Sequence, residues 1–204
     1  MTILLEKLRK PKLELRIVSP IDVNFEKKPA KKARFLGLEL VNNPLIKIFR
    51  WMSRNAAIQC HGTITFYHLD GQKVFDRTMP IRWSNSLQPI AMNFEIDGKR
   101  YSISDLNQFT LEPKIDVYPG ESERIDLAAR FDEENESYGW SNQSYFSDPP
   151  WRNPDWKLSK GRYLIYITIT SSGDKCKGLF RLINDVGQKD FRIENARPED
   201  FKKI

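Results

Sequence analysis

Apolar residues recur at every second position over much of the chain, with charged or polar residues between them. Alternation of this kind is typical of β-strands that have one buried and one solvated side. Glycine-containing turn pairs such as Asp70-Gly71 and Pro119-Gly120 separate the alternating segments. The alternating sets are Leu13, Leu15 and Ile17; Leu36, Leu38 and Leu40; Ile58, Cys60, Ile64 and Phe66; Met79, Ile81 and Trp83; Ile125, Leu127, Ala129 and Phe131; Tyr163, Ile165, Ile167 and Ile169; and Phe180 and Leu182.

This pattern predicts an all-β fold, an antiparallel β-sandwich of about eight strands. The 204 residues suit one such domain over 1–204, and we expect residues 1–10 and 196–204 to form less ordered tails. Two segments interrupt the alternation. Asn43 suits a helix cap and Pro44 a first helical turn, so a short inserted helix is predicted at 44–56. Residues 132–157 are too long for a hairpin and are expected to form a long aromatic loop.

The segment Leu158-Ser-Lys-Gly-Arg-Tyr-Leu-Ile-Tyr-Ile resembles the start of strand F in immunoglobulin-like and fibronectin III-like sandwiches. In those folds a Tyr begins the strand and its hydroxyl bonds to the upstream backbone, a role that the resemblance implies for Tyr163. The order of Leu36–Asn42, Ala57–Leu69 and Pro119-Gly120 is similar to that in adhesion-related (CARDB-type) immunoglobulin-like domains of bacteria and archaea. The predicted helix and the long loop depart from that family. The resemblance implies a fold and no function, since this fold hosts many unrelated activities.

Charge is unevenly distributed within the formal total of +6. Residues 1–54 carry 13 Lys or Arg against 5 Asp or Glu, whereas 105–160 carry 6 against 12. A local basic excess attracts anionic surfaces, although a solvated surface with uneven charge is the favoured explanation. Two cysteines rule out a disulfide-dense secreted scaffold. With no signal peptide or transmembrane run, we expect a cytoplasmic protein, or an extracytoplasmic one only if the chain is a fragment.

Catalytic chemistry is poorly supported. His61 and His68 are the only histidines, and their odd spacing on one strand directs them to opposite faces, away from a shared metal. No phosphate loop, nucleophile elbow or paired carboxylate motif occurs, so the sequence predicts no catalytic residue, metal ligand or cofactor. An enzyme is therefore disfavoured.

Two surfaces have the composition of binding sites. In the aromatic loop, Trp140, Tyr145, Trp151 and Trp156 accompany Asn, Asp and Arg, a mixture that suits peptide or sugar stacking. On the predicted helix, Lys47, Arg50 and Arg54 lie opposite an apolar stripe with Trp51 at its border, as in helices that dock in a partner or on an anionic membrane. Each has a structural alternative: the loop aromatics can anchor the loop to the sandwich, and the helix can cap an open end.

These features predict a non-enzymatic module that binds another protein through the aromatic loop, the basic helix, or both. The alternatives are a carbohydrate-binding module that uses the loop tryptophans, and a peripheral membrane-associated domain that uses the basic helix. Nucleic acid is disfavoured as a partner, because the basic run at 27–34 has no interleaved aromatic residues for base stacking.

Overall fold

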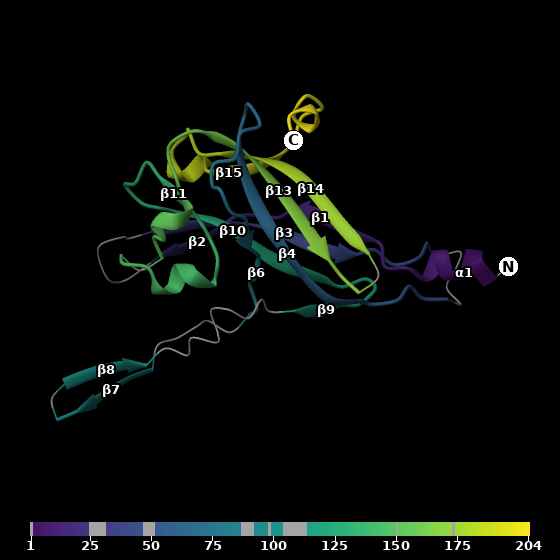
Figure 1. Cartoon of the computed structure of the whole chain (residues 1–204), viewed down its shortest axis with the longest axis horizontal. Coiled ribbons are helices and arrows are strands. Elements are labelled where there is room, and N and C mark those ends of the chain that lie inside the picture. Colours follow the sequence, from purple (N-terminus) through teal and green to yellow (C-terminus); the bar gives the residue numbers. More distant parts are fainter. Residues whose placement is uncertain are drawn as a thin grey trace.

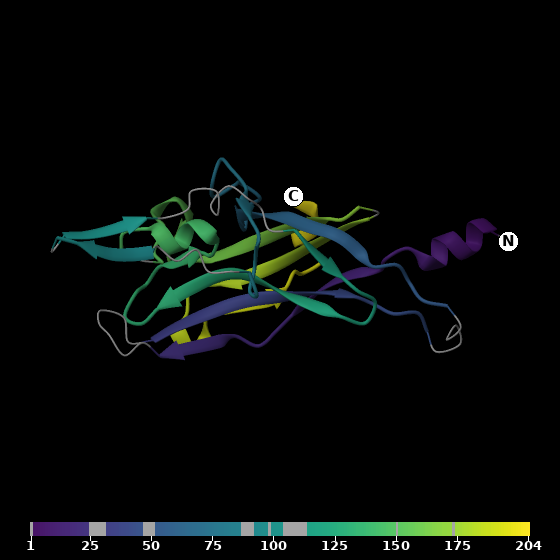
Figure 2. The same ribbon diagram turned by 90° about the horizontal axis from the view of Figure 1, so that it is seen from below.

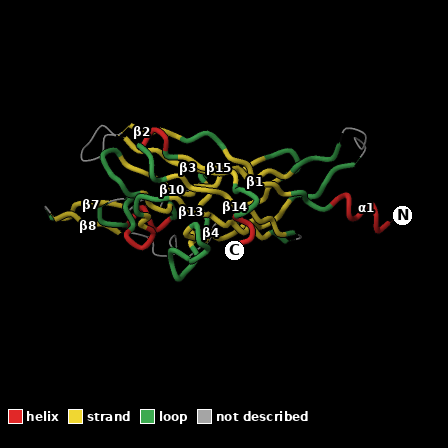
Figure 3. Tube along the Cα trace, turned by 90° about the horizontal axis from the view of Figure 1, so that it is seen from above, coloured by secondary structure: helices red, strands yellow, loops and turns green. Residues whose placement is uncertain are grey.

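In the computed structural model, which describes residues 2–24, 32–46, 52–86, 92–97, 99–103, 114–149, 151–172 and 174–204, two antiparallel sheets pack face to face. Figure 2 shows the strands from the side, and Figure 3 shows that strands make up most of the body. The predicted all-β sandwich is therefore confirmed. The chain order within the layers is shown in Figure 1.

The first sheet has seven strands in the order β1-β3-β10-β11-β12, with β2 beside β3 and β6 beside β10. The second has six in the order β15-β14-β13-β4-β5, with β9 beside β4. Strands β7 and β8 form a separate hairpin, drawn to one side of the sandwich in Figure 1. The strands are β1 Leu13–Ile17, β2 Ile21–Asn24, β3 Lys32–Asn42, β4 Ala57–His68, β5 Met79–Pro80, β6 Arg82–Trp83, β7 Met92–Ile96, β8 Lys99–Ile103, β9 Ile115–Val117, β10 Ser122–Phe131, β11 Ser137–Gly139, β12 Lys157–Leu158, β13 Arg162–Thr170, β14 Lys175–Ile183 and β15 Arg192–Asn195.

The helices are short. An α-helix, α1, covers Thr2–Arg9 at the N-terminal end, within the segment expected to be a tail. The 3-10 helices are η2 Asn142–Phe146, η3 Pro154–Trp156, η4 Gln188–Asp190 and η5 Asp200–Lys202. The helix predicted at 44–56 is not present in the described parts of that segment, because 44–46 and 52–56 are irregular; residues 47–51 lie outside the described residues.

The main core lies between the two sheets and contains most of the residues that the alternation singled out. Leu36, Leu38 and Leu40 of β3 face Ile165, Ile167 and Ile169 of the opposite sheet, all with 2% exposure or less. Apolar burial of this kind is the main stabilising contribution to the fold.

Two bulges change the faces predicted for individual residues. The register between β4 and β9 shifts between Ala57 and Cys60, where Gln59 has a φ of 56°. Ile58, predicted to face inward, is consequently 46% exposed, and Ala57 is buried in its place. An extra residue on a strand reverses every side chain beyond it, which alternation alone does not reveal.

The second bulge lies between Asp126 and Ala128 of β10. Before it, Ile125 and Leu127 face the main core as predicted. After it, Ala129 and Phe131 belong to a separate apolar cluster, and the four residues therefore do not share one face. This reversal creates a second buried surface on the outer side of the seven-stranded sheet.

The bond expected of Tyr163 is confirmed. Its hydroxyl donates to the carbonyl oxygen of Ser159 at 2.8 Å, and the ring is 5% exposed at the start of β13. The same carbonyl accepts from Nδ2 of buried Asn184 at 2.9 Å. Together these bonds hold the corner that leads from β12 into β13.

The C-terminal segment is anchored to the body, although it was expected to be a tail. Arg181 of β14 donates to both carboxylate oxygens of Asp200, at 2.6 and 2.7 Å, and Asp200 is fully buried. The backbone N–H of Arg197 donates to the same carboxylate at 2.8 Å. Bidentate charge-assisted bonds of this kind are among the strongest polar contacts in proteins.

Candidate binding pocket

The candidate site lies on the outer face of the seven-stranded sheet, where the chain crosses between the two layers. Strand β5 pairs with β4 in one sheet, and β6 pairs with β10 in the other. Ile81 and Trp83 remain in the core through this crossing, so Arg82 between them points to the opposite side. There it lies opposite Asp126, its register partner on β10.

The loop that follows β11 covers this face. Trp140 is 4% exposed and packs edge-to-face on Phe35 of β3 and on Tyr145 of η2, with ring centroids 4.9 and 5.5 Å apart. Trp151 packs against the same cluster and is partly exposed. Edge-to-face aromatic pairs fix the relative orientation of the rings, so these residues form a defined wall.

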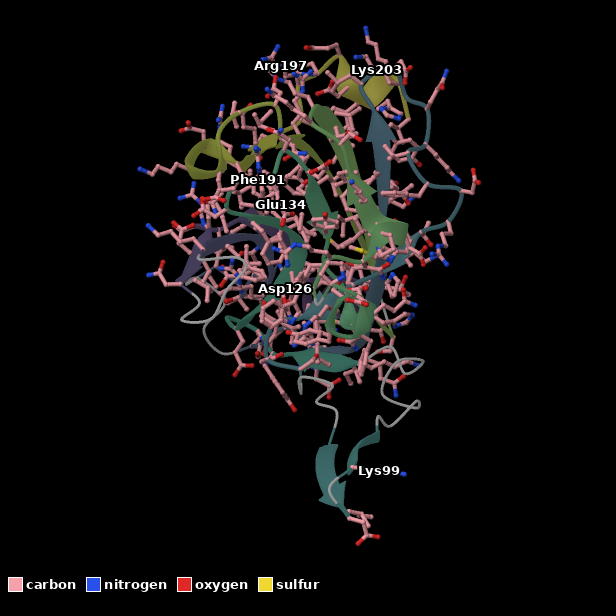
Figure 4. All side chains as sticks on the ribbon, turned by 90° about the vertical axis from the view of Figure 1, so that its left-hand side faces the viewer. Lys99, Asp126, Glu134, Phe191, Arg197 and Lys203 are labelled. Atoms are coloured by element: carbon pink, nitrogen blue, oxygen red, sulfur yellow. The ribbon has the colours of Figure 1, made fainter. Side chains whose placement is uncertain are left out.

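Between this wall and the sheet lies a cavity of about 290 Å³. Its apolar side combines edge strand β2 with the aromatic wall, and its polar side is formed by the residues at the crossing. The lining consists of Ile21, Val23, Phe35, Trp140, Tyr145 and Trp151, together with Arg82, Ser84 and Asp126. Figure 4 shows Asp126 within the body of the sandwich, far from Lys99 on the β7–β8 hairpin.

A buried ion pair forms the floor of the cavity. Nε of Arg82 lies 3.5 Å from Oδ2 of Asp126, with the two side chains 2% and 18% exposed. The other two guanidinium nitrogens donate to Oδ1 of Asn142 at 3.0 Å and to the carbonyl oxygen of Ser86 at 3.1 Å. The guanidinium carbon also lies 5.0 Å from the ring centre of Tyr145, a cation–π contact that ties the floor to the wall.

Asp126 is the accessible polar group of the floor. Its Oδ1 accepts from the hydroxyl of Ser84 at 2.5 Å. Burial raises the pKa of the Asp126 carboxyl above its ordinary value, although the bond from Ser84 and the charge of Arg82 both act to lower it. The second carboxylate oxygen, Oδ2, lies 3.5 Å from Nε of Arg82, so it is less closely engaged than Oδ1.

Trp151 is held in an unusual backbone conformation, with a φ of 67°. A bulky residue rarely adopts this left-handed region, because Cβ approaches the following carbonyl. Backbone strain of this kind is found mainly where the surrounding structure requires a particular side-chain position. Here it places the indole at the rim of the cavity.

The structure brings together three of the four predicted aromatic residues, Trp140, Tyr145 and Trp151. Trp156 lies elsewhere: it is 1% exposed in the main core, beside Phe75 at a ring distance of 5.1 Å and under the guanidinium of Arg77. For Trp156 the structural alternative therefore applies, since it anchors its loop and presents no ring face to solvent.

The predicted basic helix has a different outcome. Lys47, Arg50 and Trp51 lie outside the described residues. Arg54 is half-buried, and its guanidinium donates to the carbonyl oxygens of Leu8 and Lys10 at 2.9 and 3.0 Å. Arg54 thus ties the C-terminal end of α1 to the segment that precedes β4.

Sequence reasoning missed Arg82, Ser84 and Asp126. One signal was present: Arg82 stands between Ile81 and Trp83, both assigned to the core, so a charged residue had to occupy the outer side of a short crossing strand. Nothing in the sequence paired it with Asp126, which is 44 positions away, since that pairing depends on the register between β6 and β10.

Two larger cavities have less specific linings. One of about 660 Å³ is bordered by Ile58, Tyr118 and Arg54, whose guanidinium is already bound to backbone carbonyls. Another, of about 530 Å³, is bordered by Cys176 and by Glu14, whose side chain is 49% exposed. In contrast to the 290 Å³ pocket, neither has a buried ion pair as its floor.

Within the described part of the chain, no cluster of three or more His, Cys, Asp or Glu residues is arranged to hold a metal ion. The described helices include none with the length and apolar character needed to cross a membrane. Comparisons with protein-family models, with curated proteins and with solved structures give no match to this chain.

Proposed function

We propose that this protein is a non-enzymatic interaction module of immunoglobulin-like type that holds one side chain of a partner protein in the outer-face pocket. The observation that carries the proposal is the combination of a rigid aromatic wall with a buried polar floor in one cavity. Interface hot spots have this form, an aromatic-lined, desolvated pocket that receives an anchor residue.

The size of the cavity favours a side chain over a free ligand. Sites for small molecules and cofactors usually enclose about 300–1,000 Å³. At about 290 Å³ the pocket is at the lower limit of that range and suits a single residue of a larger partner. A partner protein also supplies contacts outside the pocket, which a small ligand lacks.

The proposal of an immunoglobulin-like type is supported by the corner at Tyr163, whose hydroxyl bonds to Ser159 as in that fold. A glycan is less well supported. Sugar stacking needs an accessible ring face, and Trp140 and Trp156 are only 4% and 1% exposed.

The test is affinity capture from a native lysate with quantitative mass spectrometry. Wild type is compared with Trp151→Ala, which removes one wall of the pocket, and with Tyr118→Ala, which removes an aromatic ring that is 54% exposed and does not line the pocket. We expect a partner that is retained by wild type and Tyr118→Ala and lost with Trp151→Ala. If Trp151→Ala remains folded and retains every partner, the pocket is not the binding site.

A further inference from the structure

The acceptor character of the pocket floor allows the occupant to be specified. We infer that the pocket receives a neutral aromatic side chain that carries an N–H or O–H donor, a tryptophan or tyrosine of the partner. The inference rests on the proposed function and adds the chemistry of the anchor residue.

A donor is required because of the state of Asp126. Its Oδ1 is engaged by the hydroxyl of Ser84, whereas Oδ2 has Arg82 Nε at 3.5 Å, beyond the length of a strong charged hydrogen bond. The carboxylate is 18% exposed, so an occupant displaces the water that reaches it. An apolar occupant leaves that oxygen desolvated and unpaired, which is costly, whereas an N–H or O–H replaces the lost water.

A charged occupant fits the floor less well. The Arg82 guanidinium is already adjacent to Asp126, and the charge of Arg124 also acts on the carboxyl and lowers its pKa. A cation that enters the cavity is therefore repelled by the buried charge of Arg82 and by the nearby charge of Arg124. An anion gains little, because Arg82 is 2% exposed and its nitrogens face Asn142, Ser86 and Asp126.

The size and walls of the cavity favour an aromatic ring. A dry protein cavity of about 150 Å³ holds a benzene molecule, and this pocket has about 290 Å³, enough for a ring that carries a polar group. The rings of Phe35, Trp140, Tyr145 and Trp151 surround it. Aromatic pairs gain stabilisation beyond their buried area, which adds to the preference for a ring over an aliphatic chain.

Two pairs of fragments test the inference on the intact protein: indole with 1-methylindole, and phenol with anisole. Each pair differs by the methyl group that replaces the donor hydrogen. Binding is followed by NMR through the indole N–H signals of Trp140 and Trp151 and the backbone signals of Ser84 and Asp126. We expect indole and phenol to shift these signals, with affinities about tenfold higher than those of their methylated partners, as for a hydrogen bond to a charged acceptor.

Two variants locate the effect. Asp126→Asn removes the charge and is expected to shrink the difference between indole and 1-methylindole. Tyr145→Leu removes part of the wall and is expected to weaken both fragments alike. Because Asp126→Asn deprives the buried Arg82 of its counter-charge and can fail to fold, the wild-type comparison of matched fragments decides the question by itself.

Equal affinity of indole and 1-methylindole overturns the inference, as does tighter binding of butylammonium, acetate or cyclohexane than of indole. If no fragment binds while partner capture still depends on Trp151, the anchor chemistry is wrong and the proposed function stands. If donor fragments are preferred but capture does not depend on Trp151, the pocket chemistry stands and the proposed function fails.

Discussion

Replacement of Asp200 by alanine removes the carboxylate that ties the C-terminal segment to β14. In the native protein this group receives three bonds, two from the guanidinium of Arg181 and one from the N–H of Arg197. Arg181 is 7% exposed in the native protein. Without the Asp200 carboxylate, its nearest remaining carboxylate in the described structure is that of Glu199, at 3.5 Å. The buried cation then lacks most of its compensation.

Loss of one partner from a buried ion pair costs about 3–5 kcal/mol. We expect Asp200→Ala to lower the free energy of unfolding by about 3 kcal/mol, the lower limit of that range. The reason is that Glu199, which is 55% exposed, partly replaces the lost charge. If the urea m-value is about 2 kcal/mol per molar, the unfolding midpoint falls by about 1.5 M. Asp76→Ala is the matched control, since Asp76 is exposed, and its expected change is below about 0.5 kcal/mol.

The dependence on pH gives a second measurement. The Arg181 guanidinium holds the pKa of Asp200 below its ordinary value of 3.8. A lowered folded-state pKa contributes stability that is present above the unfolded-state pKa and is lost as pH falls through the folded-state pKa. The stability difference between wild type and Asp200→Ala is therefore expected to be full near neutral pH and to shrink below about pH 4.

Equilibrium urea unfolding at pH 7, 5 and 3, followed by tryptophan fluorescence, measures both effects. A midpoint for Asp200→Ala equal to that of Asp76→Ala refutes the buried pair. A large difference that persists unchanged to pH 3 refutes its electrostatic origin. Hydrogen exchange shows whether the segment 196–204 detaches locally before the sandwich unfolds.

Other predictions address the corner, the thiols and the bulge. Tyr163→Phe removes one hydrogen bond and should lower the free energy of unfolding by about 1 kcal/mol. Calorimetry should then show a fall of about 2–4 °C in Tm. An unchanged Tm contradicts the role of the corner. Burial raises the pKa of Cys60 and Cys176 to about 11, so a thiol reagent at pH 7.5 should modify them slowly until the protein unfolds; rapid labelling of the folded protein contradicts their burial. Ile58→Asp should be tolerated and Ile64→Asp should not, by thermal unfolding, because the first residue is 46% exposed and the second is fully buried; equal destabilisation argues against the bulge.

Alternation in the sequence was sufficient to locate the long strands β3, β4, β10, β13 and β14, because each of them packs side chains into the core between the two sheets. It predicted the wrong face of the strand at two places, at Ile58 and at the pair Ala129 and Phe131. In both cases a bulge adds a residue to one strand, and a pattern with a period of two residues contains no record of that insertion. On β10 the predicted faces are correct before the bulge and reversed after it. On β4 the opposite holds, because Ile58 before the bulge is reversed, whereas Cys60, Ile64 and Phe66 after it face the core as predicted.

The candidate site was predicted only in part. Its aromatic half was found because Trp140, Tyr145 and Trp151 lie in one conspicuous stretch of the chain. Its polar half was not, because Arg82 and Asp126 meet only through the pairing of β6 with β10. Trp156 is close to Trp151 in sequence but is the last residue of η3 and lies in the main core.

The sequence by itself determined the class of fold and the position of the long strands, since these depend on local periodicity, and its resemblance to immunoglobulin-like sandwiches implied the corner at Tyr163. Only the tertiary structure decided which aromatic rings are sealed in the core and which border a cavity. It also decided that a buried arginine and a partly exposed aspartate form the floor of that cavity. The physical reason is that register, bulges and the crossing between sheets are fixed by packing between distant segments, and the pocket exists only where those segments meet.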